Sequence, residues 1–232
     1  MTTDYQAFLT YKRIVAPMVG REAQTSDIHS ALFDFQRDLV CWAVRKGRAA
    51  LFADTGLGKT RMQVEWARLM GGTALIIAPL SVARQTVKEA ARIGVTVTYV
   101  RQPSEIAGDG LYITNYELIE RFDASVFTAV VLDESSILKA LDGKTRQRLT
   151  ELFSATPYRL CCTATPAPND IAEIANHAEF LGVMRRVEML ASFFVHDDTG
   201  WRLKRHAETA FYRWMASWAM SVRRPSDLGY SD

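Results

Sequence analysis

A glycine-rich loop between an apolar run and a helical pattern limits the possible folds of this chain more than any other feature of its sequence. Residues 51–60 read LFADTGLGKT; the apolar run 49–53 leads into them, and a helical pattern over 59–70 follows. Glycines let successive backbone N–H groups turn toward a phosphate, and the following helix directs its positive end to the same point. Ala53 stands where the GxxxxGK[ST] pattern begins with glycine, a position that needs only a small residue. The spacing predicts a loop that binds nucleotide phosphates.

The residues of this loop have separate expected roles. Lys59 is expected to reach the β- and γ-phosphates, and the Thr60 hydroxyl to bind Mg²⁺. Upstream, Gln36 lies on an amphipathic helical segment, and its amide offers a donor and an acceptor that suit the edge of adenine. Considered alone, Gln36 fits an exposed helical position better. The loop residues expected to surround the phosphates are Thr55, Gly56, Leu57, Gly58, Lys59 and Thr60.

A pair of carboxylates follows a second apolar run. The segment FTAVVLDESSILKA brings Asp133 and Glu134 to the end of the run 127–132. Asp133 is expected to hold Mg²⁺ through water, and Glu134 to orient and deprotonate the attacking water. The alternative is a solvated acidic loop. In RLCCTATPAPND, Thr163 and Thr165 follow another apolar run, and their hydroxyls are expected to hydrogen-bond these carboxylates; ordinary turn chemistry is the alternative.

The chain alternates short apolar runs with longer segments of helical period, which predicts an α/β fold with a parallel sheet covered by helices on both faces. In such folds, ligands bind at the carboxyl ends of the strands. The glycine-rich loop and the acidic pair should therefore lie on one rim. The expected strands are 49–53, 73–78, 95–100, 111–114, 127–132 and 158–163, and the expected helices are 59–70, 81–93, 115–122 and 144–153.

The character of the sequence changes at about Asn169. We therefore expect one domain over 1–169 and a mainly helical appendage over 170–232, with helices over 171–180, 184–194 and 207–222. A hairpin that turns at Asp198-Thr199-Gly200 interrupts them, and Pro225 ends the last helix. The aromatic residues of the appendage are expected to pack against the first domain rather than stack on bases; they are Trp201, Phe211, Tyr212, Trp214 and Trp218. Its basic residues are expected to form a solvated face, and a track along a duplex backbone is the alternative; they are Arg185, Arg186, Arg202, Lys204 and Arg205.

Composition limits the class of protein. The chain has 232 residues and a formal net charge of +2, so it lacks the strong basic character of a domain that grips DNA alone. Cys41, Cys161 and Cys162 have neither disulfide-framework nor metal-site spacing, and Cys161 and Cys162 are expected to face opposite sides of one strand. The sequence starts without a secretory pattern and has no apolar run long enough to span a membrane. A cytoplasmic protein is expected.

Several motifs in order carry a resemblance to a known family. Gln36, ADTGLGKT, APLSVARQ, YITNYEL, LDESSILKA and CTATPAPND resemble the motifs of superfamily-two helicases of DEAD/DEAH type, and most closely those of Swi/Snf-like DNA translocases of phage and bacterial type. The resemblance implies a RecA-like lobe that binds ATP and Mg²⁺ and belongs to a DNA-dependent ATPase. Asp133, Glu134 and Lys139 match the acidic motif, whereas Ser136 replaces its histidine.

The resemblance also implies partners. DNA contacts fall on Pro79, Ser81, Thr114 and Asn115, through backbone N–H groups and hydroxyls that bind phosphate. The segment SWAMSVRRPSDLG resembles the Arg-Arg element at the exit from the first lobe. A second RecA-like lobe, in cis or in trans, is expected to supply arginine fingers, so the lobe alone should be weakly active. The alternatives are a non-catalytic lobe that senses nucleotide and docks a partner protein, and an RNA-directed DEAD-box relative.

Overall fold

The computed structural model describes residues 15–140, 143–167, 169–198 and 200–232. Within them, one sheet has the strand order β3-β4-β2-β5-β6-β1-β9, and every neighbouring pair is parallel. The strands are β1 (Arg48–Ala53), β2 (Thr73–Ala78), β3 (Val97–Tyr99), β4 (Gly110–Asn115), β5 (Ala129–Asp133), β6 (Tyr158–Thr163) and β9 (Ala219–Val222). The expected parallel sheet is confirmed.

Some expectations lie outside the described residues. These are the N-terminal stretch considered for a secretory signal, Pro168 of the motif CTATPAPND, Thr199 of the hairpin turn and the side chain of Lys139.

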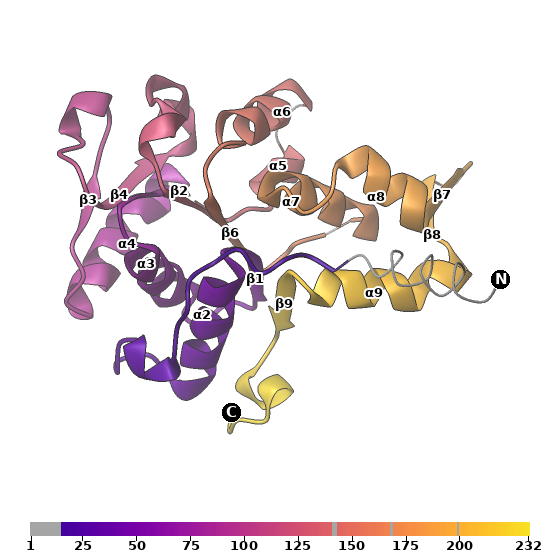
Figure 1. Cartoon of the computed structure of the whole chain (residues 1–232), viewed down its shortest axis with the longest axis horizontal. Coiled ribbons are helices and arrows are strands. Elements are labelled where there is room, and N and C mark those ends of the chain that lie inside the picture. Colours follow the sequence, from indigo (N-terminus) through magenta and orange to yellow (C-terminus); the bar gives the residue numbers. More distant parts are fainter. Residues whose placement is uncertain (1–14, 141–142, 168, 199) are drawn as a thin grey trace.

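Helices cover both faces of the sheet (Figure 1). One face carries α2 (Asp34–Lys46), α3 (Lys59–Met70) and α4 (Leu80–Arg92), and the other carries α5 (Ile137–Ala140), α6 (Gly143–Leu152) and α7 (Ile174–Leu181). Each central strand is buried on both faces, so that alternate residues belong to different halves of the core. The 3₁₀ helices are η1 (Thr25–Asp27), η2 (Pro103–Glu105), η3 (Tyr116–Arg121), η4 (Ala124–Val126), η5 (Ile171–Glu173), η6 (Arg205–Ala207) and η7 (Pro225–Leu228).

The three cysteines behave as small core residues. All are buried and free. On β6, Cys161 packs with the side of the core that holds α7, and Cys162 packs with the side that holds α2 and α3. The expectation that these two neighbours face opposite sides of a strand is confirmed.

The last expected helix is wrong in its C-terminal part. The helix α9 (Glu208–Ala216) ends early, and β9 follows it and pairs with β1 in parallel. The Ala50 N–H donates to the Trp218 carbonyl and the Asp54 N–H to the Val222 carbonyl, both at 2.9 Å. A helix here would have left these groups of β1 unpaired. The segment after residue 170 therefore returns to the main sheet.

Between α7 and α9 the chain forms an extension whose aromatic side chains join the half of the core on the α7 side of the sheet. It contains α8 (Arg186–Phe193) and the antiparallel hairpin of β7 (Phe194–Asp197) and β8 (Gly200–Leu203), which confirms the expected hairpin. Phe211, Trp214 and Trp218 are fully buried, with 5.3 Å between the ring centroids of the two tryptophans. These three rings pack inside the protein, as expected, whereas the Tyr212 side chain, for which the same packing is expected, is exposed. Within the described ranges, none of the helices combines the length and the apolar character needed to cross a membrane.

Candidate nucleotide site

The glycine-rich loop leaves β1 and enters α3 through two left-handed residues. Gly56 has a φ of 89° and Gly58 a φ of 75°. A Cβ on Gly58 would lie 2.4 Å from the Gln36 amide nitrogen, so a side chain at this position would displace the Gln36 amide. Thr55 and Gly56 are exposed, and the residues from Leu57 to Thr60 are half-buried. The loop thus presents backbone to solvent at the start of a helix, as a phosphate-binding loop must.

Lys59 lies across this loop. Its ammonium donates to the Ala53 carbonyl at 2.8 Å and to the Asp54 carbonyl at 3.1 Å. Thr60 follows it in the first turn of α3. The positive charge is thus held at the carboxyl end of β1, beside the loop. This arrangement fits a nucleotide phosphate.

Gln36 supports the loop from beneath. It is only 3% exposed; its carbonyl oxygen accepts from the Phe33 N–H at 3.0 Å, and its amide donates to the Leu57 carbonyl at 2.9 Å. The alternative of an exposed helical residue is therefore wrong. Gln36 joins the start of α2 to the phosphate loop, and its contact with adenine stays a prediction.

The acidic pair lies at the carboxyl end of β5. Glu134 has a left-handed backbone with a φ of 56°, which is costly for a residue with a side chain. Its carboxylate accepts from the Ser136 hydroxyl at 2.6 Å and from the Thr163 hydroxyl at 2.8 Å. The hydrogen bond expected from Thr163 is present. Thr165 contributes its backbone instead, since its N–H donates to the Thr163 hydroxyl oxygen at 3.1 Å.

Asp133 is buried, and burial raises the pKa of its carboxyl. Gln63 beside it opposes this shift, the nearby Glu134 charge raises the pKa further, and Lys59 lowers it. Since β6 lies between β5 and β1 in a parallel sheet, the carboxyl ends of all three strands meet at one edge. The structure therefore brings Lys59 and the acidic pair together on the expected rim, with Thr60 next to Lys59.

Three contacts hold the acidic turn from below. The Ser135 N–H donates to the Cys162 carbonyl at 2.9 Å, and the Tyr116 hydroxyl donates to the Asp133 carbonyl at 2.8 Å. The His177 Nε2 atom lies 3.1 Å from the Ser135 hydroxyl. Sequence reasoning missed both Tyr116 and His177. Tyr116 could have been found because it follows Asn115 within YITNYEL, whereas a single histidine in a helical segment gives no signal.

His177 also contacts the strand that leads into the phosphate loop. Its ring meets Phe52 edge-on, with 5.2 Å between the ring centroids. The imidazole is 1% exposed, and burial lowers its pKa to about 4. A neutral histidine from α7 thus packs beneath both the phosphate loop and the acidic turn.

The residues predicted to contact DNA differ in exposure. Pro79 is half-buried and Ser81 is exposed, both at the start of α4. The side chain of Thr114 is fully buried, so its hydroxyl does not face a phosphate as expected, and Pro79 has neither an N–H nor a hydroxyl to offer. Asn115 is 4% exposed, and its amide oxygen accepts from the Tyr99 hydroxyl at 3.2 Å.

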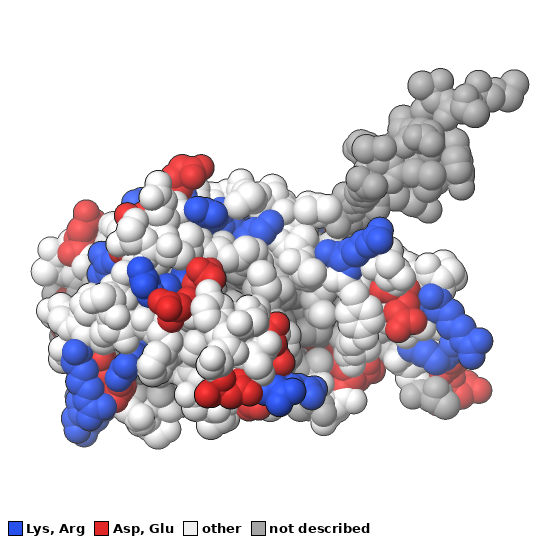
Figure 2. Space-filling view, turned by 90° about the horizontal axis from the view of Figure 1, so that it is seen from below, with Lys and Arg blue, Asp and Glu red and all other residues white. Residues whose placement is uncertain are grey.

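Basic residues of the C-terminal extension are engaged locally. Arg202 pairs with Asp197 at 3.0 Å, Arg185 pairs with Glu188, and the Lys204 ammonium donates to the Ala191 carbonyl at 2.7 Å. On the face drawn in Figure 2, basic and acidic side chains are interspersed. These contacts agree with the expected solvated face.

The acid groups suit a hard cation that keeps much of its water. Among the described residues, no three His, Cys, Asp or Glu side chains gather into a metal cluster. Mg²⁺ in phosphate-transfer sites takes one or two protein ligands and completes its shell with phosphate oxygens and water. Asp133 and the Thr60 hydroxyl are the candidate ligands of this kind at the edge of the sheet.

Comparison with known proteins rests on structure, because neither a family model nor a curated protein matches the chain. The SWI2/SNF2 ATPase core of Sulfolobus solfataricus, solved in complex with dsDNA, matches with a TM-score of 0.69 and 20% identity over 88% of this chain and 46% of that one. The UvsW helicase of bacteriophage T4 matches with a TM-score of 0.53 and 15% identity over 68% of this chain and 61% of that one.

A third match is the hypothetical ATP-dependent RNA helicase from Sulfolobus tokodaii, with a TM-score of 0.50 and 16% identity over 65% of this chain and 50% of that one. The chain thus spans about half the length of these solved structures. It has the RecA-like α/β fold that the helicase and ATPase cores of these solved structures share.

Proposed function

We propose that this chain is the ATP- and Mg²⁺-binding first motor lobe of a DNA-dependent ATPase of helicase or translocase type. One observation carries the proposal: the adjacent parallel strands β1, β6 and β5 bring Lys59 of the phosphate loop and the Asp133–Glu134 pair to the same edge of the sheet. A cation, a metal-binding carboxylate and a candidate base on one rim are the parts that phosphoryl transfer to water requires.

Each residue has a defined part in this proposal. The backbone from Thr55 to Gly58 and the Lys59 ammonium hold the phosphates, and Gln36 lies on the adenine side. Thr60 and Asp133 hold the magnesium ion, which neutralises charge on the phosphates when bound. Glu134 takes the proton of the attacking water, and Thr163 and Ser136 fix the orientation of its carboxylate.

DNA and a second lobe complete the proposal. The half-buried Pro79 and the exposed Ser81 at the start of α4, and η3 directly after Asn115, lie on the same edge of the sheet as the nucleotide site. We assign the DNA phosphates to backbone N–H groups of these two segments. Support comes from the dsDNA in the complex of the similar SWI2/SNF2 ATPase core. A second RecA-like lobe, in cis or in trans, supplies the arginine fingers.

A substitution of the loop lysine tests nucleotide binding. Lys59→Ala should abolish the thermal stabilisation that ATP and Mg²⁺ give to the wild-type protein, because the phosphates lose their principal cation. Lys88→Ala, at an exposed lysine of α4, is the matched control and should keep the full shift. An equal shift in both variants would refute the proposed site.

RNA as the nucleic acid is the second candidate, favoured by the similar structure described as an RNA helicase. Duplex DNA and duplex RNA of the same sequence should be compared for their ability to displace a labelled duplex DNA from the protein. The proposal expects DNA to compete more strongly, and stronger competition by RNA would favour the RNA-directed alternative.

A non-catalytic lobe that only senses nucleotide is the other alternative. Such a lobe has less use for the Glu134 carboxylate, which two hydroxyls orient.

A further inference from the structure

The turn that carries Glu134 is strained and needs support. A left-handed backbone at a residue with a side chain costs about 1–3 kcal/mol and persists only where surrounding contacts fix it. Here the supports come from three parts of the fold: Cys162 on β6, His177 on α7, and Tyr116 on η3. Any change in one of these contacts alters the balance that holds Glu134 at a φ of 56°.

Tyr116 differs from the other two supports in its origin. It directly follows Asn115 at the carboxyl end of β4, and β2 lies between β4 and β5 in the sheet. The side chain therefore spans the end of a whole strand to donate its hydrogen to the Asp133 carbonyl at 2.8 Å. It links η3 to the peptide group that precedes Glu134.

The hydroxyl is a dependable donor. Burial, with the nearby Asp133 charge, raises the pKa of Tyr116 well above its usual value. The group therefore stays protonated at physiological pH, and a carbonyl oxygen can only accept from it. The hydrogen bond from the Tyr116 hydroxyl to the Asp133 carbonyl therefore depends only on the position of η3.

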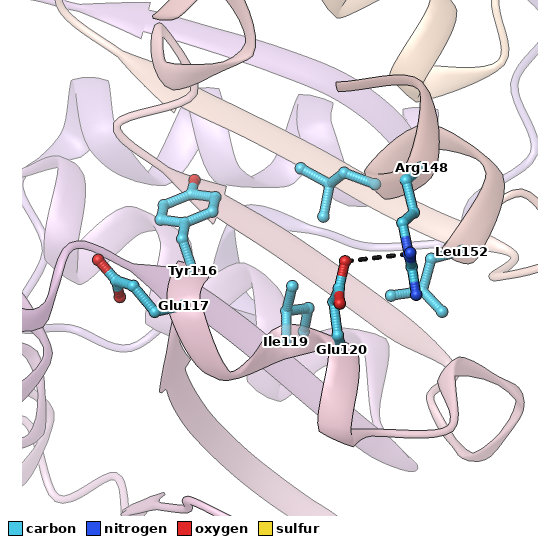
Figure 3. A pocket seen from close by; sticks show the side chains of 7 residues that line it. Tyr116, Glu117, Ile119, Glu120, Arg148 and Leu152 are labelled. Atoms are coloured by element: carbon cyan, nitrogen blue, oxygen red, sulfur yellow. Dashed lines mark ion pairs between the residues drawn. The ribbon is translucent and has the colours of Figure 1, made fainter. Parts of the chain in front are cut away.

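The surroundings of Tyr116 leave room for η3 to move. A hollow of about 200 Å³ lies beside the ring, between η3 and α6, with Ile119, Leu149 and Leu152 in its lining (Figure 3). At its edge, Glu120 and Arg148 form an ion pair at 2.9 Å whose side chains are 55% and 69% exposed. An exposed ion pair of this kind stabilises the present position of η3 relative to α6 only weakly. A shift of η3 toward α6 thus meets space rather than packed side chains.

We infer that Tyr116 is a positioning residue that couples binding of a DNA backbone at η3 to the Asp133–Glu134 turn. The inference rests on the proposed function, which assigns η3 to DNA. When DNA displaces η3, the hydrogen bond from the Tyr116 hydroxyl moves the Asp133 carbonyl, and the orientation of the Glu134 carboxylate changes with it. Hydrolysis then responds to DNA without any contact between DNA and the acidic residues.

The experiment uses hydrogen exchange of the nucleotide-free protein, read by mass spectrometry over residues 134–138. The Ser135, Ile137 and Leu138 N–H groups in this segment are hydrogen-bonded to Cys162, Glu134 and Ser135 carbonyls. Tyr116→Phe removes the hydroxyl and keeps the ring. Exchange of the segment should become about fivefold faster, which is the factor expected for one net hydrogen bond.

Tyr112→Phe is the matched control. Tyr112 lies on the same strand, β4, and its hydroxyl donates to the Gly108 carbonyl at 3.0 Å, at the opposite end of the strand. This variant should keep wild-type exchange over 134–138. Equal exchange of the segment in both variants and the wild type would overturn the assigned role.

Duplex DNA provides the readout that a merely structural role would not change. Adding a short duplex should alter exchange over 134–138 in the wild type and in Tyr112→Phe, and leave it unaltered in Tyr116→Phe although DNA still binds. DNA that binds without any effect on this segment in the wild type overturns the coupling. Failure of the proposed function shows itself separately, as absent DNA binding in a gel shift or an absent thermal shift with ATP.

Discussion

At the scale of single residues, Glu134 shows how the site combines strain with orientation. Its backbone is left-handed, and its carboxylate accepts two hydroxyl hydrogens, from Ser136 and Thr163. Ser136 stands where the resembling family has a histidine, yet it binds the acid directly. The serine thus helps to position the Glu134 carboxylate, because its short side chain can reach back two residues along the turn.

Thr163→Val should separate orientation of the base from binding of the nucleotide. The change removes the bond to Glu134, and we expect hydrolysis to fall by about tenfold, since a loosened base loses part of the 10²–10⁴ that positioned proton transfer contributes. Nucleotide-induced thermal shifts should stay unchanged, and stability should fall by about 1 kcal/mol. Thr86→Val is the control, a buried threonine whose hydroxyl donates to the Val82 carbonyl within α4. Equal losses of hydrolysis in both variants would contradict the role of Thr163.

His177 should make stability depend on pH. In the unfolded chain His177 binds a proton near its usual pKa of 6.5, whereas in the folded protein its pKa is lowered to about 4. The contribution of His177 is therefore fully present above pH 6.5 and is lost as the pH falls from 6.5 toward 4. Urea unfolding should show a loss of about 2 kcal/mol between pH 7 and pH 5 from this group.

His177→Gln should flatten that pH dependence, and His206→Gln, at an exposed histidine, should keep the wild-type slope. If His177→Gln kept the wild-type dependence of unfolding free energy on pH, that dependence would not come from protonation of His177.

At the scale of elements, β9 is an added edge strand rather than the end of a helix. It covers the hydrogen-bonding groups of β1 directly before the phosphate loop, and its bond to the Asp54 N–H reaches the first loop residue. Trp218, which leads into β9, is fully buried and meets Phe52 edge-on, with 6.4 Å between the ring centroids. The position of the phosphate loop therefore depends on residues from the far end of the chain.

Deletion of residues 218–232 should test this dependence. It removes a buried tryptophan, worth about 3–5 kcal/mol, and leaves the edge of β1 open. We expect the melting temperature to fall by about 10 °C or more, or the product to aggregate. Deletion of 229–232, which spares β9, should lower it far less. Similar melting temperatures for both deletions would contradict a structural role for β9.

At the scale of the whole molecule, the proposed motor lobe has its base and phosphate loop on one open edge. The 232-residue polypeptide alone should hydrolyse ATP slowly even with duplex DNA, because arginine fingers from a second lobe contribute about 10³–10⁵ in rate. Steady-state phosphate release with and without DNA measures this. Rapid DNA-stimulated turnover by the pure monomer would contradict the need for a second lobe.

Much of the fold follows from local patterns in the sequence. The helix over Lys59–Met70 and the strands Thr73–Ala78 and Tyr158–Thr163 have the predicted bounds. Each combines a clear period with glycine or polar residues at its ends, so local propensity and burial agree. The stretch after β4 differs, since a 3₁₀ helix replaces the expected α-helix over 115–122. Its Tyr116 is bonded to the end of β5, a contact that no local pattern encodes.

The order of apolar runs and the Gly-Lys-Thr and Asp-Glu signals by themselves determined a parallel α/β fold with both motifs on one rim, because strand polarity sends all their carboxyl ends to one edge. Three features came from packing in the folded domain: Gln36 supports the loop, His177 and Tyr116 hold the acidic turn, and residues 219–222 form a strand. These features depend on partners from about 20 to 170 positions away in the chain. Pairings at such separations are set by the packing of the whole domain.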